Sequence, residues 1–295
     1  MDLSKLKNRP AYPFETIAVA ITFSPTLEPV LAEAKRLSDK LKSAMLLIHI
    51  GEKTSDKEEK LYKLLDKYSI DKNNTRVIWM DGEPIETILK LCKLNIVDLL
   101  IIGALPKENI YKYYMGSVAR SISRKAKCSV LLLIKPSTES SKPKKIVVNG
   151  AENPKTIHTI NTALYLAKTY NIKEITVVKE VHTPTLAMTM ADDSTAPEAN
   201  KFKKNFNEEE SHKLHDVLSK CRELQETAVI EKVVNGKPGY AISKYAKDKK
   251  ADLLVINSPD MHLTFLDRIF THDIEYILAN LPSNLLIVHS RISNG

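Results

Sequence analysis

The residues best suited to bind a ligand are Gly116 and Ser117, a Gly-Ser step that begins a basic segment. Gly103 ends an apolar segment, Pro106 follows after two residues, and Gly116-Ser117 comes after a further nine, at the start of a basic amphipathic segment. A helix start offers unpaired N–H groups and the positive end of the helix dipole, which suits phosphate. Glycine lets the backbone approach a ligand closely, and a serine hydroxyl can donate a hydrogen bond. These properties suit the helix start at Gly116-Ser117, with the N–H of Val118, to an anion such as phosphate, and Gly103 would let the backbone approach it closely.

A run of cations follows this Gly-Ser step: Arg120, Arg124, Lys125 and Lys127. Arg120 and Arg124 share a helix face at i, i+4 spacing. Arg120 already lies one turn into the predicted helix. We therefore expect this face to be solvated, and the helix start itself to meet the ligand.

Strands alternating with helices must position these residues. Strand-like segments lie at 16–25, 44–52, 144–150 and 173–181, and apolar last strands end each half. This alternation is typical of βαβ units with parallel strands, and apolar runs without alternation indicate strands covered on both faces. Ligands of such sheets bind beyond the carboxyl ends of the strands. Thr22, Ile50 and Gly103 are expected at those ends.

The same pattern occurs twice. Residues 79–104 and 233–258 both contain a strand, a Gly-x-Pro turn, an amphipathic helix and an apolar strand. The matching positions share an offset of 154 (236 minus 82): Gly82 and Gly236, Pro84 and Pro238, Asp98 and Asp252. Each proline suits the first turn of its helix, where a missing N–H is no loss. The chain is therefore predicted to be a duplication.

We predict an α/β protein with two Rossmann-like domains, each an open, mainly parallel five-stranded sheet with helices on both faces. The first domain is expected at 1–138, a Pro-, Ser- and Lys-rich linker at 139–145, and the second domain at 146–295. The second copy has an insertion at about 182–207, which we interpret as a long surface segment whose order stays open.

Composition limits the partners. The net charge of +8 favours anionic ligands, but the 6% of aromatic residues are not interleaved with Lys and Arg, so nucleic acid has little support. No apolar run is long enough to span a membrane, and the N-terminal residues lack the apolar core of a signal peptide. A cytoplasmic location with three reduced cysteines is expected.

The ordered set of motifs resembles the universal stress protein family, whose nucleotide-binding members carry Gly-x2-Gly-x9-Gly-Ser/Thr. The resemblance covers nearly the whole chain, twice. It implies an adenine nucleotide such as ATP, with or without Mg²⁺, with its phosphates at Gly103, Gly116 and Ser117. Thr22 would line the ribose and Ile50 the adenine. Family members commonly dimerise through the last strand, so we expect 129–134 to pair with 284–289 within the chain as a pseudo-dimer; a homodimer of such chains stays open.

The first copy departs from the family at two positions. ATP-binding relatives usually end strand one with Asp, whereas this chain has Thr22, which brings no charge. The second loop glycine is Pro106, which removes one N–H. Lys107 and Lys112 add positive charge to the loop. Whether this copy still binds nucleotide stays open.

The second copy departs further, and we expect a vestigial site. Asn149 replaces the strand-one Asp, and Glu180 stands where the first copy has Ile50. Asn257 and Asp260 replace two loop glycines, and Thr271-His272 replaces Gly-Ser. A carboxylate near the phosphates repels them.

Three functions remain in consideration. The leading one is a non-catalytic stress-response sensor or scaffold that binds an adenine nucleotide in the first domain. The alternatives are a ligand-free interaction scaffold with unknown protein partners and, with least support, a slow ATPase, because no Walker motif is present. We assign no catalytic residue and no metal ligand. His212, His215 and Glu208 share a helix face, but such spacing is common on solvated helices.

Overall fold

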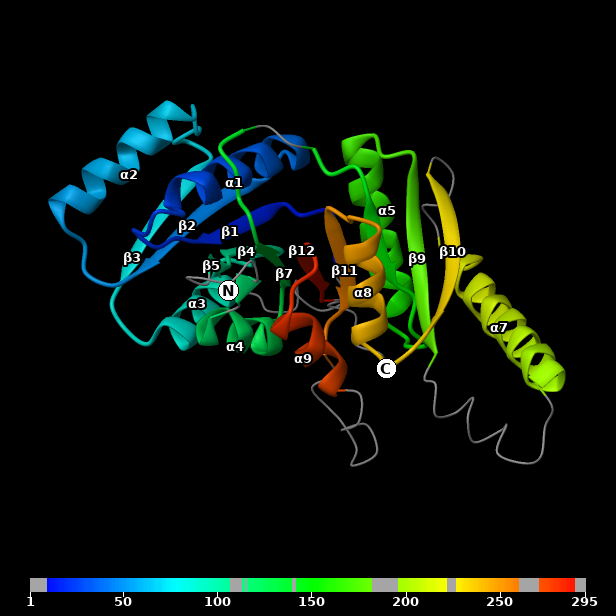
Figure 1. Cartoon of the computed structure of the whole chain (residues 1–295). Coiled ribbons are helices and arrows are strands. Elements are labelled where there is room, and N and C mark those ends of the chain that lie inside the picture. The colour runs from blue at the N-terminus through cyan, green and yellow to red at the C-terminus, as the bar shows by residue number, and fades with distance from the viewer. Residues whose placement is uncertain are drawn as a thin grey trace. The chain divides into compact units, whose positions relative to one another are not determined.

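The computed structural model describes residues 10–106, 113–114, 116–139, 142–181, 196–221, 227–259 and 271–289 (Figure 1). The chain forms two compact units, one of Met1–Lys142 with Asn284–Gly295 and the other of Pro143–Ser283. Both are α/β units built on parallel strands, as predicted. The limits of the linker at 139–145 stay a prediction.

The first unit has a five-stranded parallel core in the order β7-β4-β1-β2-β3. These strands are β1 (Thr16–Ala20), β2 (Ala44–Ile50), β3 (Thr75–Met80), β4 (Leu99–Gly103) and β7 (Ser129–Leu133). The helices are α1 (Leu27–Leu41), α2 (Ser55–Lys67), α3 (Pro84–Leu94) and α4 (Ser117–Lys125). Figure 1 shows α1 on one side of the strands and α3 and α4 on the other. The central strands are buried because helices cover both of their faces.

The second unit repeats the plan with four parallel strands in the order β10-β9-β8-β11. They are β8 (Ile146–Asn149), β9 (Glu174–Val181), β10 (Ala228–Asn235) and β11 (Leu253–Asn257). Its helices are α5 (Thr156–Tyr170), α7 (Ala196–Leu218), α8 (Tyr240–Asp248) and α9 (Thr271–Ala279). Part of the insertion expected at 182–207 is helical, because α7 begins at Ala196 and packs on β9 and β10.

The last strand of the sequence, β12 (Asn284–Val288), belongs to the first unit. It pairs antiparallel with β7, with Leu286 opposite Leu131. Asn284 Oδ1 accepts the N–H of Ile134 at 2.9 Å, and the His289 N–H reaches Ser129 Oγ at 3.2 Å, so both ends of the pair are fixed. The predicted pairing of the two last strands is confirmed.

The repeated aspartate has the same role in both copies. Asp98 Oδ2 accepts the N–H groups of Glu15 and Thr16 at 2.9 and 2.8 Å, at the start of β1. Asp252 Oδ2 accepts those of Lys144 and Lys145 at 2.7 and 2.9 Å, just before β8. Each carboxylate therefore holds the entry of the opening strand of its own copy, which supports the duplication independently of the sequence match.

The repeated Gly-x-Pro turns differ in one respect. Pro84 is the first helical residue of α3, as predicted. In the second copy, however, α8 begins only at Tyr240, two residues after Pro238, so the expectation for Pro238 is wrong. The reason is Gly239, whose φ of 76° lies in the left-handed region, so that the helical backbone conformation begins only after this residue.

Candidate functional site

Three of the predicted site residues stand at the carboxyl ends of adjacent strands. Ile50 ends β2 and Gly103 ends β4, on either side of β1. Thr22 follows β1 after one intervening residue and is exposed, while Ile50 and Gly103 are half-buried. The structure therefore brings these three residues to one edge of the first sheet, which is where open α/β sheets bind ligands.

The start of α4 faces the same edge. Because β4 and β7 are parallel, the connecting helix must run back from the carboxyl edge to the amino edge, so its N-terminus lies beside the strand ends. Gly116 is the N-cap residue, and the helix begins at the exposed Ser117. The Arg120 N–H makes the first helical bond, to the Gly116 carbonyl at 3.0 Å. The N–H groups of Ser117, Val118 and Ala119 precede this bond.

The N-cap residue of α4, Gly116, has no side chain that could accept a backbone N–H, and the first turn of the helix has no acidic residue. By contrast, Thr54 caps α2 by accepting the Lys57 N–H, and Glu83 caps α3 by accepting the Glu86 N–H at 2.8 Å. An uncapped helix start keeps its partial positive charge available to an anion.

Gly103 has a packing role that the sequence did not indicate. A Cβ atom built on this residue would lie 2.9 Å from Val30 Cγ2 on α1. The close approach of α1 to β4 thus requires glycine at this position, whether or not a ligand binds there.

Pro106 lies in a short hairpin. Its strand β5 (Leu105–Pro106) pairs antiparallel with β6 (Tyr113–Tyr114), with Pro106 opposite Tyr113. Residues 107–112, including Lys107 and Lys112, lie outside the described residues, as does Met115.

A chain of hydroxyls stands where relatives carry the strand-one carboxylate. Thr22 Oγ1 lies 3.0 Å from Ser24 Oγ, which in turn lies 2.9 Å from Thr26 Oγ1. These neutral groups can donate and accept hydrogen bonds, but they bring no negative charge to the edge. They also lack the bidentate geometry that a carboxylate offers to a ligand.

Next to these three hydroxyls is an aromatic cluster that sequence reasoning missed. Phe23 stacks on Trp79 with ring centres 5.6 Å apart, and His49 meets both rings edge-on at 4.9 and 5.0 Å. His49 Nδ1 lies 3.2 Å from the Ile21 carbonyl, which can only accept, so Nδ1 carries the proton. The only available signal was register: Trp79 is directly opposite His49 in the β2–β3 pair.

In the second unit, the corresponding edge is filled by the chain's own side chains. Glu180 accepts the N–H groups of Gly239 and Ile242 at 3.0 and 2.7 Å, so a carboxylate already occupies the start of α8. Asn257, at the end of β11, accepts from the Thr159 hydroxyl and donates to Thr156 Oγ1 at 3.0 Å. Asp260 and the side chains of Thr271 and His272 lie outside the described residues.

A buried ion pair lies beside Glu180. The Lys179 ammonium, on β9, lies 2.7 Å from Glu210 on α7, and Lys213 lies 2.8 Å from the same carboxyl group. Burial raises the pKa of Glu210, but the hydrogen bonds from Lys179 and Lys213 outweigh it and hold this pKa below its ordinary value. The pair fixes α7 on the sheet where the first copy has its aromatic cluster.

The described residues include no cluster of metal-ligating side chains and no disulfide. No three His, Cys, Asp or Glu side chains there gather closely enough to hold a metal ion. His215 pairs instead with Glu231 at 2.8 Å. Cys92, Cys128 and Cys221 are buried and unbridged, and burial raises the pKa of Cys221 to about 11, which keeps it protonated at neutral pH.

The sequence model of the universal stress protein family matches residues 13–133 and again 143–289. The chain belongs to the universal stress protein family. Two matched regions make it a tandem member. No match was found among curated proteins.

Solved structures of similar length share this fold. A functionally unknown protein from Pseudomonas aeruginosa PAO1 is 16% identical, with a TM-score of 0.66 over 94% of this chain and 93% of that one. A putative universal stress protein from Pseudomonas aeruginosa UCBPP-PA14 is 15% identical, with a TM-score of 0.65 over 94% of each chain. A universal stress protein from Archaeoglobus fulgidus is 12% identical, with a TM-score of 0.61 over 94% of this chain and 99% of that one. Identity at this level supports the fold alone.

Of the helices described, none is both long enough and apolar enough to cross a membrane.

Proposed function

We propose that the first unit binds an adenine nucleotide at the carboxyl edge of its sheet, and that the protein acts as a non-catalytic stress-response sensor or scaffold. The observation that carries this proposal is the uncapped start of α4 beside the strand ends. Phosphate oxygens accept from the N–H groups of Ser117, Val118 and Ala119, and the Ser117 hydroxyl adds a donor.

The remaining contacts follow from the strand ends. Thr22 lies where a ribose hydroxyl would bind, and Ile50 offers an apolar surface to the adenine. Gly103 and Pro106 begin the loop that leads to the phosphates. Both ATP and other adenine nucleotides are within the proposal, with Mg²⁺ carried by their own phosphates.

The second unit is proposed not to bind nucleotide. Its Glu180 carboxylate, at the position that matches Ile50, accepts two N–H groups at the start of α8 and places a negative charge where the first copy offers an apolar surface to the adenine. Asn257 is committed to Thr156 and Thr159 on α5. This filled edge also favours the second candidate function, a scaffold without any ligand, which the following experiment separates from the first.

The test is a Ser117→Glu variant. A glutamate in the first turn favours the helix but repels a phosphate, so this variant should fold normally and lose nucleotide binding. With wild-type protein, ATP at 100 times its Kd should raise the free energy of unfolding by about 2.7 kcal/mol, read as a rise in melting temperature with and without Mg²⁺.

The matched control is Thr271→Glu, which places the same charge at the first residue of α9, the corresponding helix of the second copy. It should leave the ATP-induced rise unchanged. If wild-type protein shows no rise at millimolar ATP, the ligand-free scaffold is the better description. An equal rise in the Ser117→Glu variant would place the nucleotide elsewhere.

A further inference from the structure

At the carboxyl edge of the first sheet, successive rows of side chains face opposite sides. His49 and Trp79 are directly opposite each other, and the register of β1, β2 and β4 places Gly103 in the same row. A Cβ atom built on Gly103 would lie 2.9 Å from Val30 on α1, so this row faces α1. The next row must face the other side, because successive side chains of a strand alternate between the faces of a sheet.

The next row contains Ile50 and Met80, which are directly opposite each other at the ends of β2 and β3. It faces the side of the sheet on which α3 and α4 lie (Figure 1). Thr22, two residues beyond the end of β1, continues the row on its other side. Met80 is 39% exposed. The row therefore offers two neighbouring apolar side chains at the nucleotide edge, where sequence reasoning predicted Ile50 alone.

This row leads away from the start of α4. That helix joins β4 to β7, and the strand order β7-β4-β1-β2-β3 places Thr22, Ile50 and Met80 successively further from it. Each step between strands adds about 4.8 Å. A nucleotide with its phosphates at Ser117 and its ribose at Thr22 therefore has its base over Ile50, with Met80 one strand further out.

The charges along the edge favour this direction of the ligand. Met80 is followed by the exposed carboxylates Asp81 and Glu83, and Glu83 is the N-cap residue of α3. The first turn of α4 has no acidic residue. Phosphates at the β3 end of the row would meet like charges, whereas an uncharged base would not. The phosphates are therefore expected at α4 and the base at β3.

We infer that Met80 is a specificity-determining residue that makes the first unit prefer purine to pyrimidine nucleotides; this inference rests on the proposed function. The six-membered ring of a purine lies one ring further from the ribose than the ring of a pyrimidine does. It therefore extends from Ile50 to Met80, whereas a pyrimidine ends over Ile50. The flexible, polarisable thioether of methionine packs favourably against an aromatic ring. Ile50 thus contacts both kinds of base, and Met80 contacts only the larger one.

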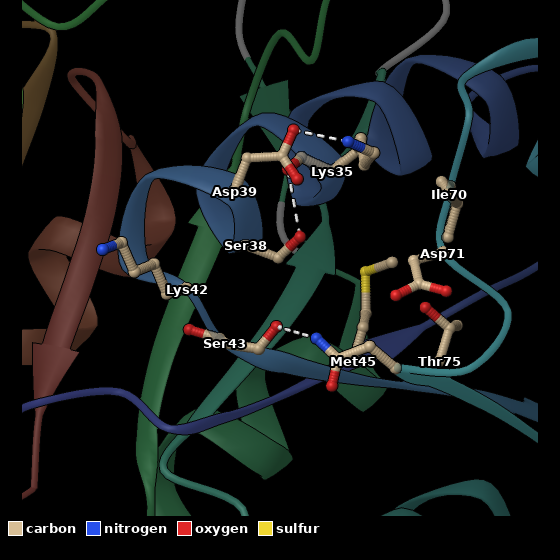
Figure 2. Close-up of a pocket in the computed structure, with 10 residues that line it drawn as sticks. Lys35, Ser38, Asp39, Lys42, Ser43, Met45, Ile70, Asp71 and Thr75 are labelled. Carbon is tan, nitrogen blue, oxygen red and sulfur yellow. Dashed lines mark hydrogen bonds and ion pairs between the residues drawn. The ribbon is translucent and has the colours of Figure 1, made fainter.

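The methyl group of Met80 reports a bound purine directly. The full chain is labelled with ¹³C-methyl methionine, and the Met80 resonance is assigned with a Met80→Leu variant. ATP should shift this resonance to saturation, because the ring current of the base acts on the methyl group. CTP should shift it far less, and inorganic tripolyphosphate, which has no base, should leave it in place. Met45 is the internal reference, because it is 4% exposed and borders a surface hollow at the opposite end of β2 (Figure 2).

Affinities of a Met80→Ala variant test the selectivity. This change should weaken ATP binding about two- to tenfold, the range expected for one sulfur–aromatic contact, and leave CTP binding unchanged in calorimetric titrations. Leu94→Ala removes another exposed apolar side chain, at the far end of α3, and should bind both nucleotides as the wild type does. Both positions are exposed, so both variants should melt at the wild-type temperature without ligand.

Three results would overturn the inference and leave the proposed function standing, provided that ATP binds and Ser117→Glu abolishes its binding. These are a Met80 resonance that does not move with ATP, wild-type ATP affinity in Met80→Ala, and an equal loss of ATP and CTP affinity in that variant. A wild-type protein that binds neither nucleotide at millimolar concentration would overturn the proposed function, and the inference with it. A shift of Met45 in place of Met80 would put the nucleotide at the amino edge and contradict both.

Discussion

At the scale of single residues, Asp98 and Asp252 show how a repeated side chain preserves a repeated structure. Each carboxylate accepts two backbone N–H groups from the segment that enters the opening strand of its copy. Asp98 is 4% exposed, so its hydrogen bonds replace water almost completely. The position was visible in the sequence as part of the repeat, but its partners lie more than 80 residues away and became evident only in the fold.

Replacing Asp98 with alanine should destabilise the first unit. The change leaves the N–H groups of Glu15 and Thr16 without their acceptor, which costs about 2–4 kcal/mol for two hydrogen bonds to a charged group. Urea unfolding followed by circular dichroism measures this loss. Asp98→Asn, which keeps an acceptor oxygen, should lose clearly less, and equal losses in both variants would refute this role for the hydrogen bonds.

At the scale of elements, matching helices of the two copies are capped by carboxylates from different places. The start of α3 is capped by Glu83, its own N-cap residue, whereas α8, the matching helix of the second copy, begins under Glu180 near the end of β9. The same backbone feature is therefore neutralised within the chain in both units. A sequence comparison marks Glu180 as a departure from Ile50 but does not reveal which N–H groups it meets.

Glu180→Ala should remove the cap of α8. We expect the free energy of unfolding to fall by about 1–2 kcal/mol, the usual cost of losing an N-terminal cap, because the N–H groups of Gly239 and Ile242 lose their acceptor. Chemical unfolding of the full chain measures it. Glu174→Ala, at the exposed start of β9, is the matched control and should change stability little; a similar loss there would assign the effect to charge alone.

Sequence reasoning predicted the elements of this protein better than its side-chain contacts. The duplication and the parallel strands follow from apolar runs and constant offsets, which local patterns carry. The β7–β12 pairing was expected from the family resemblance instead. The Phe23–Trp79 stack and the contact between Gly103 and Val30 depend on register and on helix position over tens of residues. The Pro106 hairpin was expected only as a loop, since two-residue strands leave no periodic pattern.

At the scale of the whole molecule, β12 is the most consequential strand. It lies at the end of the sequence but pairs with β7 of the first unit. A β7 edge without this partner would present unpaired N–H and C=O groups, which are a template for association.

A chain ending at Lys142 should therefore self-associate. Its β7 edge, with Val130, Leu131 and Leu132, can pair with the same strand of a second copy in place of β12. Light scattering after size exclusion should give a dimer for this fragment, with circular dichroism confirming that it is folded. A folded monomer would contradict the expectation, and adding a Leu131→Lys substitution to the fragment should restore the monomer.

The place of β12 also bears on how the molecule is made. The ribosome synthesises β7 well before residues 284–288. At roughly 5–20 residues per second, the time between the synthesis of the two strands is about 8–30 s. During translation, the β7 edge of the first unit thus has no β12 partner while the second unit is synthesised. The strand that completes the sheet of the first unit is thus made only after the whole of the second unit.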